Sequence, residues 1–339
     1  MRAGVLNRWE IAYPLLIGSL AIGCAVVFIL SLAIGYAPFD LGQAAADWIA
    51  GRQSLGALVL IELRLPRALL GLLVGFTLGL AGAVMQGFLR NPLAEPGIIG
   101  VSGAAALGAV IAFYFGLAAT MSLLLPLGGI LGALTAGAIL FALAGRGAGT
   151  MTLILAGIAI NSFAGALIAL ALNLSPSPYA AMEIMFWLMG SLADRSLSQV
   201  ALVFPLLLVG WVLLFWTARA LDALSLGEET AASLGFGLAQ TRAAVVGGTA
   251  LSVGGAVAVS GAIGFIGLVV PHLVRPLVAY EPGRVLLPSA LAGAILSTLA
   301  DIGVRLIGTQ PELKLGVVTA MIGAPFLFLL IWRLRSTAP

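Results

Sequence analysis

Residues that could carry out catalysis or bind a metal are scarce in this 339-residue chain. It contains one cysteine (Cys24), one histidine (His272) and a single lysine (Lys314). A zinc site takes three or four protein ligands, which one cysteine and one histidine cannot supply. A nucleotide-binding P-loop needs a lysine followed by serine or threonine, whereas leucine follows Lys314. We therefore expect no catalytic residue, no metal site and no cofactor bound by this chain.

The remaining titratable residues do not suit chemistry inside a membrane either. A serine protease would have to use His272, which has no nucleophile-elbow motif nearby, and an aspartyl protease needs two mid-membrane aspartates, of which only Asp301 is a clear intrahelical candidate. An ion-coupled carrier usually buries carboxylates near the bilayer midplane. In this chain these carboxylates lie toward the outer ends of apolar segments: Glu62, Glu183, Asp194, Asp301 and Glu312. A secondary transporter is therefore kept only as the weaker alternative.

The composition indicates an integral membrane protein. Hydrophobic residues make up 61% of the chain and charged residues only 9%, against about 25% charged residues in a soluble domain. The 44 glycines suit helices that pack closely through small residues, and the uninterrupted apolar runs do not suit a β-barrel. Because one crossing needs about 20 apolar residues, we expect ten transmembrane helices, at about residues 11–35, 58–86, 97–116, 120–143, 151–173, 197–218, 240–260, 263–279, 284–307 and 314–332.

The basic residues predict the orientation. With the N-terminus inside and ten crossings, ten of the 16 lysines and arginines lie on the cytoplasmic side and six on the outer side. Cytoplasmic loops normally carry this excess, so we expect both termini in the cytoplasm. The outer basic residues, which include Arg64, Arg67 and Arg305, need a separate explanation.

Three polar or irregular segments interrupt the apolar runs. The elbow, residues 90–96, contains two prolines that cannot continue a helix. Backbone left unpaired at membrane depth must be buried in protein or line a wet cavity, and Asn91 and Glu95 can supply partners there. The charged, glycine-broken segment 219–239 predicts one or two short helices outside the bilayer. The outer segment 174–196 is apolar enough in its middle for another short helix.

Seven stretches of the chain occur in an order and spacing that strongly resemble a known transporter family. They lie at residues 62–105, 155–162, 186–192, 221–235, 264–275, 299–305 and 312–326, and include RLPR, RNPLA, SLGEETAASLG, GFIGLVVPHLVR and ADIGVR. From about residue 60 onward the chain resembles the permease subunits of ABC importers for iron–siderophore complexes, haem and vitamin B12, the FecCD-type family. Each motif is moderately specific, and the set is highly specific.

This resemblance implies a fold and a set of partners. The fold is an all-α integral membrane protein of the type II ABC importer permease class, with about ten transmembrane helices, short cytoplasmic coupling helices, and residues 1–339 as a single permease domain. The partners are a second permease subunit, most simply a homodimer, two ATP-binding cassette subunits that use the ATP, and a periplasmic substrate-binding protein. The location is the bacterial inner membrane, and no nucleic acid is expected.

The resemblance also assigns roles to individual residues. Those similar to the family's cytoplasmic gates are Asn91, Leu93, Thr150 and Met151. Those similar to the helices that couple to the ATPase lie in segment 219–239, called the coupling segment from here on, and are Leu226, Gly227, Glu228, Ala231 and Leu234. Those similar to outer residues that dock the binding protein are Arg64, Arg67 and Arg305, which would explain their position outside.

The cargo is the least determined part of this hypothesis. The first expectation is ATP-driven import of a metal chelate, either iron–siderophore or haem, by alternating access. Vitamin B12 (cobalamin) is the alternative, since these motifs do not separate the cargoes. The chain departs from the family pattern at Lys314, where many members have proline, and at residues 279–284, where AYEPGR replaces a Gly-x-Asp-His-Arg turn. The first departure leaves the outer start of the last helix in doubt.

Overall fold

The computed structural model describes residues 3–35, 40–121, 123–144, 150–309 and 311–336, and all regular elements in these ranges are helical. Seven helical segments there are long and apolar enough to cross a membrane, and three shorter apolar helices accompany them. These ten segments correspond to the ten predicted crossings, so the predicted all-α fold is confirmed. Of the three shorter helices, Val101–Tyr114 and Ile266–Val278 each begin directly after a residue with positive φ, and Leu315–Leu330 is the last of the three along the chain.

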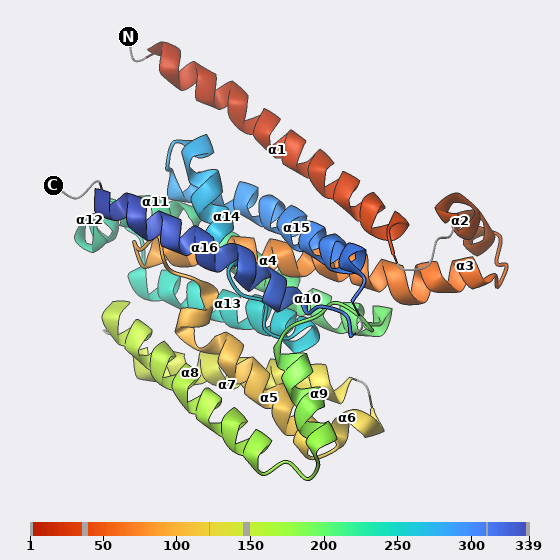
Figure 1. The fold of residues 1–339 in the computed structure, drawn as a ribbon. Coiled ribbons are helices and arrows are strands. Elements are labelled where there is room, and N and C mark those ends of the chain that lie inside the picture. Colours follow the sequence, from red (N-terminus) through yellow and green to blue (C-terminus); the bar gives the residue numbers. More distant parts are fainter. Residues whose placement is uncertain (1–2, 36–39, 122, 145–149, 310, 337–339) are drawn as a thin grey trace.

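The helices follow one another along the chain as Figure 1 shows. The helices that contain the ten apolar segments are α1 (Ala3–Ala33), α3, η1 and α4 together (Leu55–Leu58, Val59–Arg64, Leu65–Phe88), α5 (Val101–Tyr114), α7 (Leu124–Ala144), α8 (Thr150–Asn173), α10 (Leu197–Trp216), α13 (Leu238–Ser260), α14 with η3 (Ile266–Val274, Arg275–Val278), α15 (Pro282–Ile307) and α16 (Leu315–Ser336). The connecting helices are α2 (Leu41–Ile49), η2 (Pro96–Ile99), α6 (Leu117–Thr120), α9 (Pro178–Leu188), α11 (Ala218–Leu224) and α12 (Glu228–Ser233).

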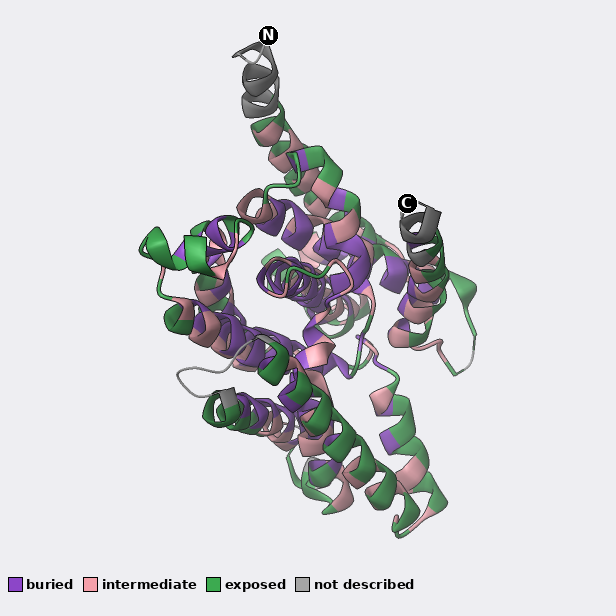
Figure 2. Cartoon of the chain, turned by 90° about the vertical axis from the view of Figure 1, so that its left-hand side faces the viewer, coloured by how far each residue is buried: buried purple, intermediate pink, exposed green. Residues whose placement is uncertain are grey.

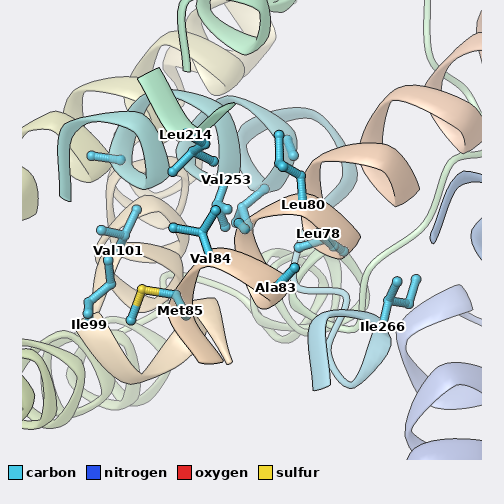
Figure 3. Close-up of a cluster of buried hydrophobic side chains, with 14 of the residues drawn as sticks. Leu78, Leu80, Ala83, Val84, Met85, Ile99, Val101, Leu214, Val253 and Ile266 are labelled. Carbon is cyan, nitrogen blue, oxygen red and sulfur yellow. The ribbon is translucent and has the colours of Figure 1, made fainter. Parts of the chain in front are cut away.

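Helix α4 is the central element of the bundle. It contacts α15, α14, α13 and α10, and most of its residues are buried. Figure 2 shows buried residues gathered in the middle of the molecule, and Figure 3 shows Leu80 and Val84 of α4 near Val253 of α13. Helices α4 and α15 approach so closely that a Cβ atom at Gly75 would overlap the backbone and side chains of residues 293–297. Small residues therefore allow the contact around which the other helices pack.

The helices divide the functional segments between two ends of the bundle. The start of α1 and the end of α16 lie at the same end as α12 (Figure 1), as an even number of crossings requires. The elbow also lies at this end, which we call the elbow end. Arg64 ends η1, which follows α3, and Arg305 lies near the end of α15; these segments lie at the opposite end of the bundle (Figure 1), called the arginine end. The sequence predicts that the elbow end is cytoplasmic.

Two of the predicted crossings are interrupted by tight backbone turns. The predicted run 97–116 begins as the 3-10 helix η2, and only after Gly100, which has a φ of 76°, does α5 start. The predicted run 263–279 likewise starts with extended chain, because Gly261 (φ 71°) and Phe265 (φ 67°) hold the segment between α13 and α14 in a break. Left-handed φ is easy for glycine but strained for phenylalanine. The two breaks therefore need support from their surroundings.

Candidate functional site: two polar ends and a central break

The elbow is a compact turn stabilised by its own asparagine. Helix α4 ends at Phe88, and Arg90 adopts a φ of 49°, which turns the chain away from the helix axis. The Asn91 N–H donates to the Gln86 carbonyl at 3.2 Å, and the Leu93 N–H donates to Asn91 Oδ1 at 2.9 Å. The expectation that Asn91 supplies a hydrogen-bond partner in the elbow is thus confirmed. Its role as a gate stays a prediction.

The other predicted gate residues lie on α8. Met151 is exposed, and Thr150 begins the helix, although its side chain lies outside the described part of the chain. Just after the elbow, η2 packs directly on α8: Gly157 approaches the backbone of Ile98 and Ile99 so closely that a Cβ atom would overlap it. The structure therefore joins the elbow to α8, which is the physical connection that a shared gate would need.

The coupling segment forms two short helices at the elbow end, as predicted. Leu226 and Leu234 are exposed, whereas Ala231 is buried against the bundle. Gly227 has a φ of 108°, which only glycine adopts without strain, and it allows the sharp turn between α11 and α12. Asp222 Oδ1 accepts a hydrogen bond from the Gly283 N–H at 2.6 Å, which ties α11 to the start of α15.

A cavity of about 280 Å³ separates the elbow from the coupling segment. Arg90 and Asn91 line it from the elbow, and Ser225 lines it from the coupling segment. Across the same space, Arg90 Nη2 lies 3.8 Å from Glu228 Oε1, a weak and half-exposed ion pair. The ion pair between the elbow and α12 is thus weak, whereas α11 of the coupling segment packs on α4 and α15.

At the arginine end, Arg67 is bound by two carboxylates from distant parts of the chain. Its Nε and Nη2 atoms donate to both oxygens of Asp301 at 2.9–3.0 Å. It also donates to both oxygens of Glu312, through Nη1 at 3.3 Å and through Nη2. Asp301 lies on α15 and Glu312 precedes α16, so this one guanidinium connects three segments. Bidentate pairs of this kind are directional as well as strong.

Arg64 and Arg305 hold the end of α1. Arg305 donates to the Ser31 and Ile34 carbonyls at 2.8 and 2.7 Å, and Arg64 donates to the Leu32 and Ala33 carbonyls at 2.8 and 2.7 Å. The last carbonyls of a helix lack intrahelical donors and carry partial negative charge. Both arginines are buried, and Arg305 Nη2 also lies 3.1 Å from Asp301 Oδ2. They are therefore structural partners of α1 in this chain.

The three arginines of the docking prediction do lie together. They line one cavity of about 320 Å³ at the arginine end, which Asp194 and Glu312 also line. The sequence did not predict that Asp301 and Glu312 already bind Arg67. The sequence did contain one indication of this pairing: both carboxylates lie at the predicted outer ends of apolar runs, on the same side of the membrane as the arginines. Whether a partner protein docks there stays a prediction.

The unusual residue Lys314 also has a place at this end. Its Nζ atom lies 5.4 Å from the ring centroid of Phe186 on α9, in a cation–π contact. The adjacent start of α16 is held by the Gly316 N–H, which donates to the Gly190 carbonyl at 3.4 Å. The helix thus begins at Leu315 without the proline that the family pattern has. In the described part of the chain, no group of three or more His, Cys, Asp or Glu residues could hold a metal ion.

A third polar site lies between the two ends, at the backbone breaks. Glu95 of the elbow lies beside Phe265, at the break between α13 and α14, and both residues line one cavity. Burial raises the pKa of the Glu95 carboxyl, and the nearby Phe265 N–H opposes the shift. The structure thus brings Glu95 to a segment that the sequence did not connect with it, and its role as a partner for unpaired backbone stays a prediction.

These features define a multi-pass helical membrane protein with a weak, half-exposed ion pair beside a cavity at one end and a buried ionic cluster at the other. The model of the FecCD transport family matches residues 23–333, nearly the whole chain. The chain belongs to this family and is an ABC importer permease, a transport subunit.

Individual relatives agree with this assignment. The chain is 40% identical over 335 residues to the vitamin B12 import system permease protein BtuC of Salmonella arizonae, which covers 98% of this chain and 95% of the relative. The BtuC protein of Salmonella typhimurium is also 40% identical, with 98% and 96% covered. A solved inward-facing ABC transporter assigned to the metal-chelate type has 32% identity and a TM-score of 0.83, covering 94% of this chain and 99% of that one.

The ionic cluster generates a prediction about stability. Asp301→Asn preserves the shape of the side chain but removes the charge that compensates Arg67 and Arg305 in a buried site. We expect the free energy of unfolding to fall by about 3–5 kcal/mol, as for other broken buried ion pairs. Denaturant titration in detergent micelles measures this. The matched control is Glu281→Gln, which disrupts a half-exposed pair with Arg284 and should cost less than about 1 kcal/mol. Equal losses in both variants would contradict the structural role of the cluster.

Proposed function

We propose that this chain is the permease subunit of an importer for vitamin B12 or a closely related corrinoid. The observation that carries this proposal is the 40% identity to BtuC proteins along nearly the entire chain. It favours cobalamin, the alternative cargo, over the iron chelate or haem of the first expectation. The likeness to a metal-chelate type transporter is compatible with both, because cobalamin is itself a chelated metal.

The proposed mechanism is alternating access driven by separate ATPase subunits. The coupling segment would bind them through Leu226 and Leu234, whose side chains are 67% and 60% exposed. Displacement of this segment would reach the elbow across the cavity that they share, and would reach α8 through η2. Because the contact between Arg90 and Glu228 is weak and half-exposed, it can break and re-form during each cycle.

A second permease copy would complete the pathway. Helix α8 presents large apolar side chains such as Leu155 and Phe163 to the outside, and α16 presents Met321 and Phe328. Contiguous exposed apolar surface in a membrane protein faces lipid or another helix. We infer that these helices face a second copy around a central pathway. Native mass spectrometry of the purified complex measures this directly, and a single permease copy per complex would exclude it.

Docking of a substrate-binding protein at the arginine end rests on Arg67. Arg64 and Arg305 are engaged by carbonyls of α1, whereas Arg67 lies at the cavity with part of its side chain exposed. A carboxylate of the partner would have to compete with Asp301 and Glu312 for this guanidinium. Arginine stays charged at any working pH and binds carboxylates bidentately, so it is suited to that exchange.

The cargo is tested by transport. The permease is purified with the ATPase subunits and binding protein of the same organism and reconstituted in proteoliposomes that contain ATP. We expect ATP-dependent accumulation of radiolabelled cobalamin, and no accumulation of haem or of a ferric hydroxamate. The matched control omits ATP. Uptake of either iron compound in place of cobalamin would overturn the proposed cargo.

The proposed coupling role predicts that a charge introduced at Leu226 weakens binding of the ATPase subunits. In Leu226→Asp the new carboxylate has no partner in the apolar contact, so the amount of ATPase that copurifies should fall about tenfold or more, a cost above 1.4 kcal/mol. The control is Leu55→Asp, because Leu55 is 79% exposed at the opposite, arginine end. This variant should leave the amount of copurified ATPase unchanged. Normal copurification with Leu226→Asp would remove the coupling segment from the interface.

The proposed docking role predicts that removing the Arg67 guanidinium weakens binding of the substrate-binding protein. Arg67→Gln should weaken binding of the loaded substrate-binding protein to the reconstituted permease about tenfold or more, equivalent to at least 1.4 kcal/mol. Arg52→Gln is the control, because the exposed Arg52 side chain lies at the same end, paired with Asp47. Surface plasmon resonance on nanodiscs measures both affinities. Equal affinities for Arg67→Gln and Arg52→Gln would reject the docking assignment.

A further inference from the structure

A cavity of about 300 Å³ lies where the two backbone breaks of the bundle meet. The elbow contributes Glu95, α5 contributes Ser102 and Gly103, and the break between α13 and α14 contributes residues 262–265. Asn161 of α8 closes one side. The cavity opens to the surface of the single chain, because Asn161, Ala262 and Gly264 are exposed. It is separate from the cavities at the elbow end and the arginine end.

The elbow and α8 each contribute a side chain with hydrogen-bond acceptors to the cavity lining, Glu95 and Asn161. Glu95 lines the cavity beside Phe265, and a carboxylate has two oxygens with about four lone-pair sites. None of the ion pairs among the described residues involves Glu95. The Asn161 side chain likewise makes no hydrogen bond within the described part of the chain. Both groups therefore have capacity to accept hydrogen bonds from a ligand.

Hydrogen-bond donors enter from two helix starts. Helix α5 begins at Val101 and α14 begins at Ile266, and neither has a side-chain cap. The first N–H groups of a helix have no intrahelical acceptor, and they carry partial positive charge. In α14 the Ile266 and Leu268 N–H groups already donate to the Gly264 and Phe265 carbonyls, so Gly267 supplies the donor there. Residues of both first turns, Ser102, Gly103 and Gly267, line the cavity. Discontinuous membrane helices commonly direct such ends toward bound cargo.

We propose that this cavity is a cargo subsite that binds a neutral primary carboxamide. Glu95 and Asn161 would accept hydrogen bonds from the amide NH2 group, and the uncapped starts of α5 and α14 would donate to its carbonyl oxygen. A primary carboxamide has N–H donors for the acceptor side chains of the cavity and a carbonyl oxygen for its backbone N–H donors. The proposal rests on the proposed function, because cobalamin carries primary carboxamide arms around its corrin ring.

The charge of Glu95 gives the subsite its selectivity. A cargo carboxylate, such as a haem propionate, would face the Glu95 carboxylate at short range, and like charges placed together are strongly disfavoured. The volume of about 300 Å³ limits the subsite to one arm of a large cargo, with the ring held outside it. The subsite thus distinguishes cargoes by the side chains at their edge, and the metal plays no part in it.

The test compares two cargoes that differ in one arm: cobalamin, and a cobalamin monocarboxylic acid in which one amide is hydrolysed. Both are supplied bound to saturating binding protein, and initial uptake rates are measured in proteoliposomes of the complete transporter. We expect the wild type to prefer cobalamin. Glu95→Gln should bring the ratio of the two rates close to one. It should also slow cobalamin uptake by about three- to tenfold, as expected for one weakened hydrogen bond.

Two further variants separate charge from structure. Asn161→Asp adds a second carboxylate at an exposed position and should raise the preference for cobalamin above that of the wild type. Glu183→Gln removes an exposed carboxylate of α9, away from the cavity, and should leave the ratio unchanged. Equal uptake of both cargoes by the wild type, or an unchanged ratio in Glu95→Gln and Asn161→Asp, would overturn the subsite alone. If the wild type took up no cobalamin, the proposed function would fall and the subsite with it.

Discussion

The structure depends on one constraint, that backbone polar groups at membrane depth must find partners within the protein. Ten helical segments satisfy it along most of the described chain, and the elbow and the break between α13 and α14 are segments where helix geometry does not. These two segments lie against each other: Phe265 of the break and Glu95 of the elbow line the same cavity. The strained φ of Phe265 thus occurs where segments 170 residues apart in sequence meet.

The same constraint explains the different character of the two ends. At the arginine end the terminal carbonyls of α1 are satisfied by buried arginines, whose charge is in turn balanced by Asp301. The cluster links α1, α4 and α15 through directional, mutually dependent contacts, which makes it rigid. At the elbow end Asp222 ties α11 to α15, but only a half-exposed ion pair joins Arg90 of the elbow to Glu228 beside a cavity. A permease that changes conformation needs one end that keeps the helices in register and another whose contacts can break and re-form.

The sequence predicted the parts of this arrangement that local patterns determine. Apolar runs located the ten crossings, prolines located the elbow, and glycines with charges located α11 and α12. The contacts between Arg67 and its carboxylates were not predictable, because the residues lie 234 and 245 positions apart and only helix packing brings them together. The strained turn at Phe265 had no clear local signal either, since a bulky residue does not favour that conformation. The arginines were correctly grouped, although their carbonyl and carboxylate partners were missed.

A conduit built from broken helices has a consequence for selectivity. Apolar and glycine-lined surface holds a passing cargo weakly, which favours release, but it does not distinguish one large chelate from another. Where a helix is broken, the first backbone N–H groups of the new helix lack acceptors and can donate hydrogen bonds. A polar side chain packed beside the break adds a hydrogen-bond acceptor at the same place. In this chain that point also carries a carboxylate that no basic side chain of the described residues neutralises. The polar side chain beside the break is thus the one best placed to exclude an anionic cargo.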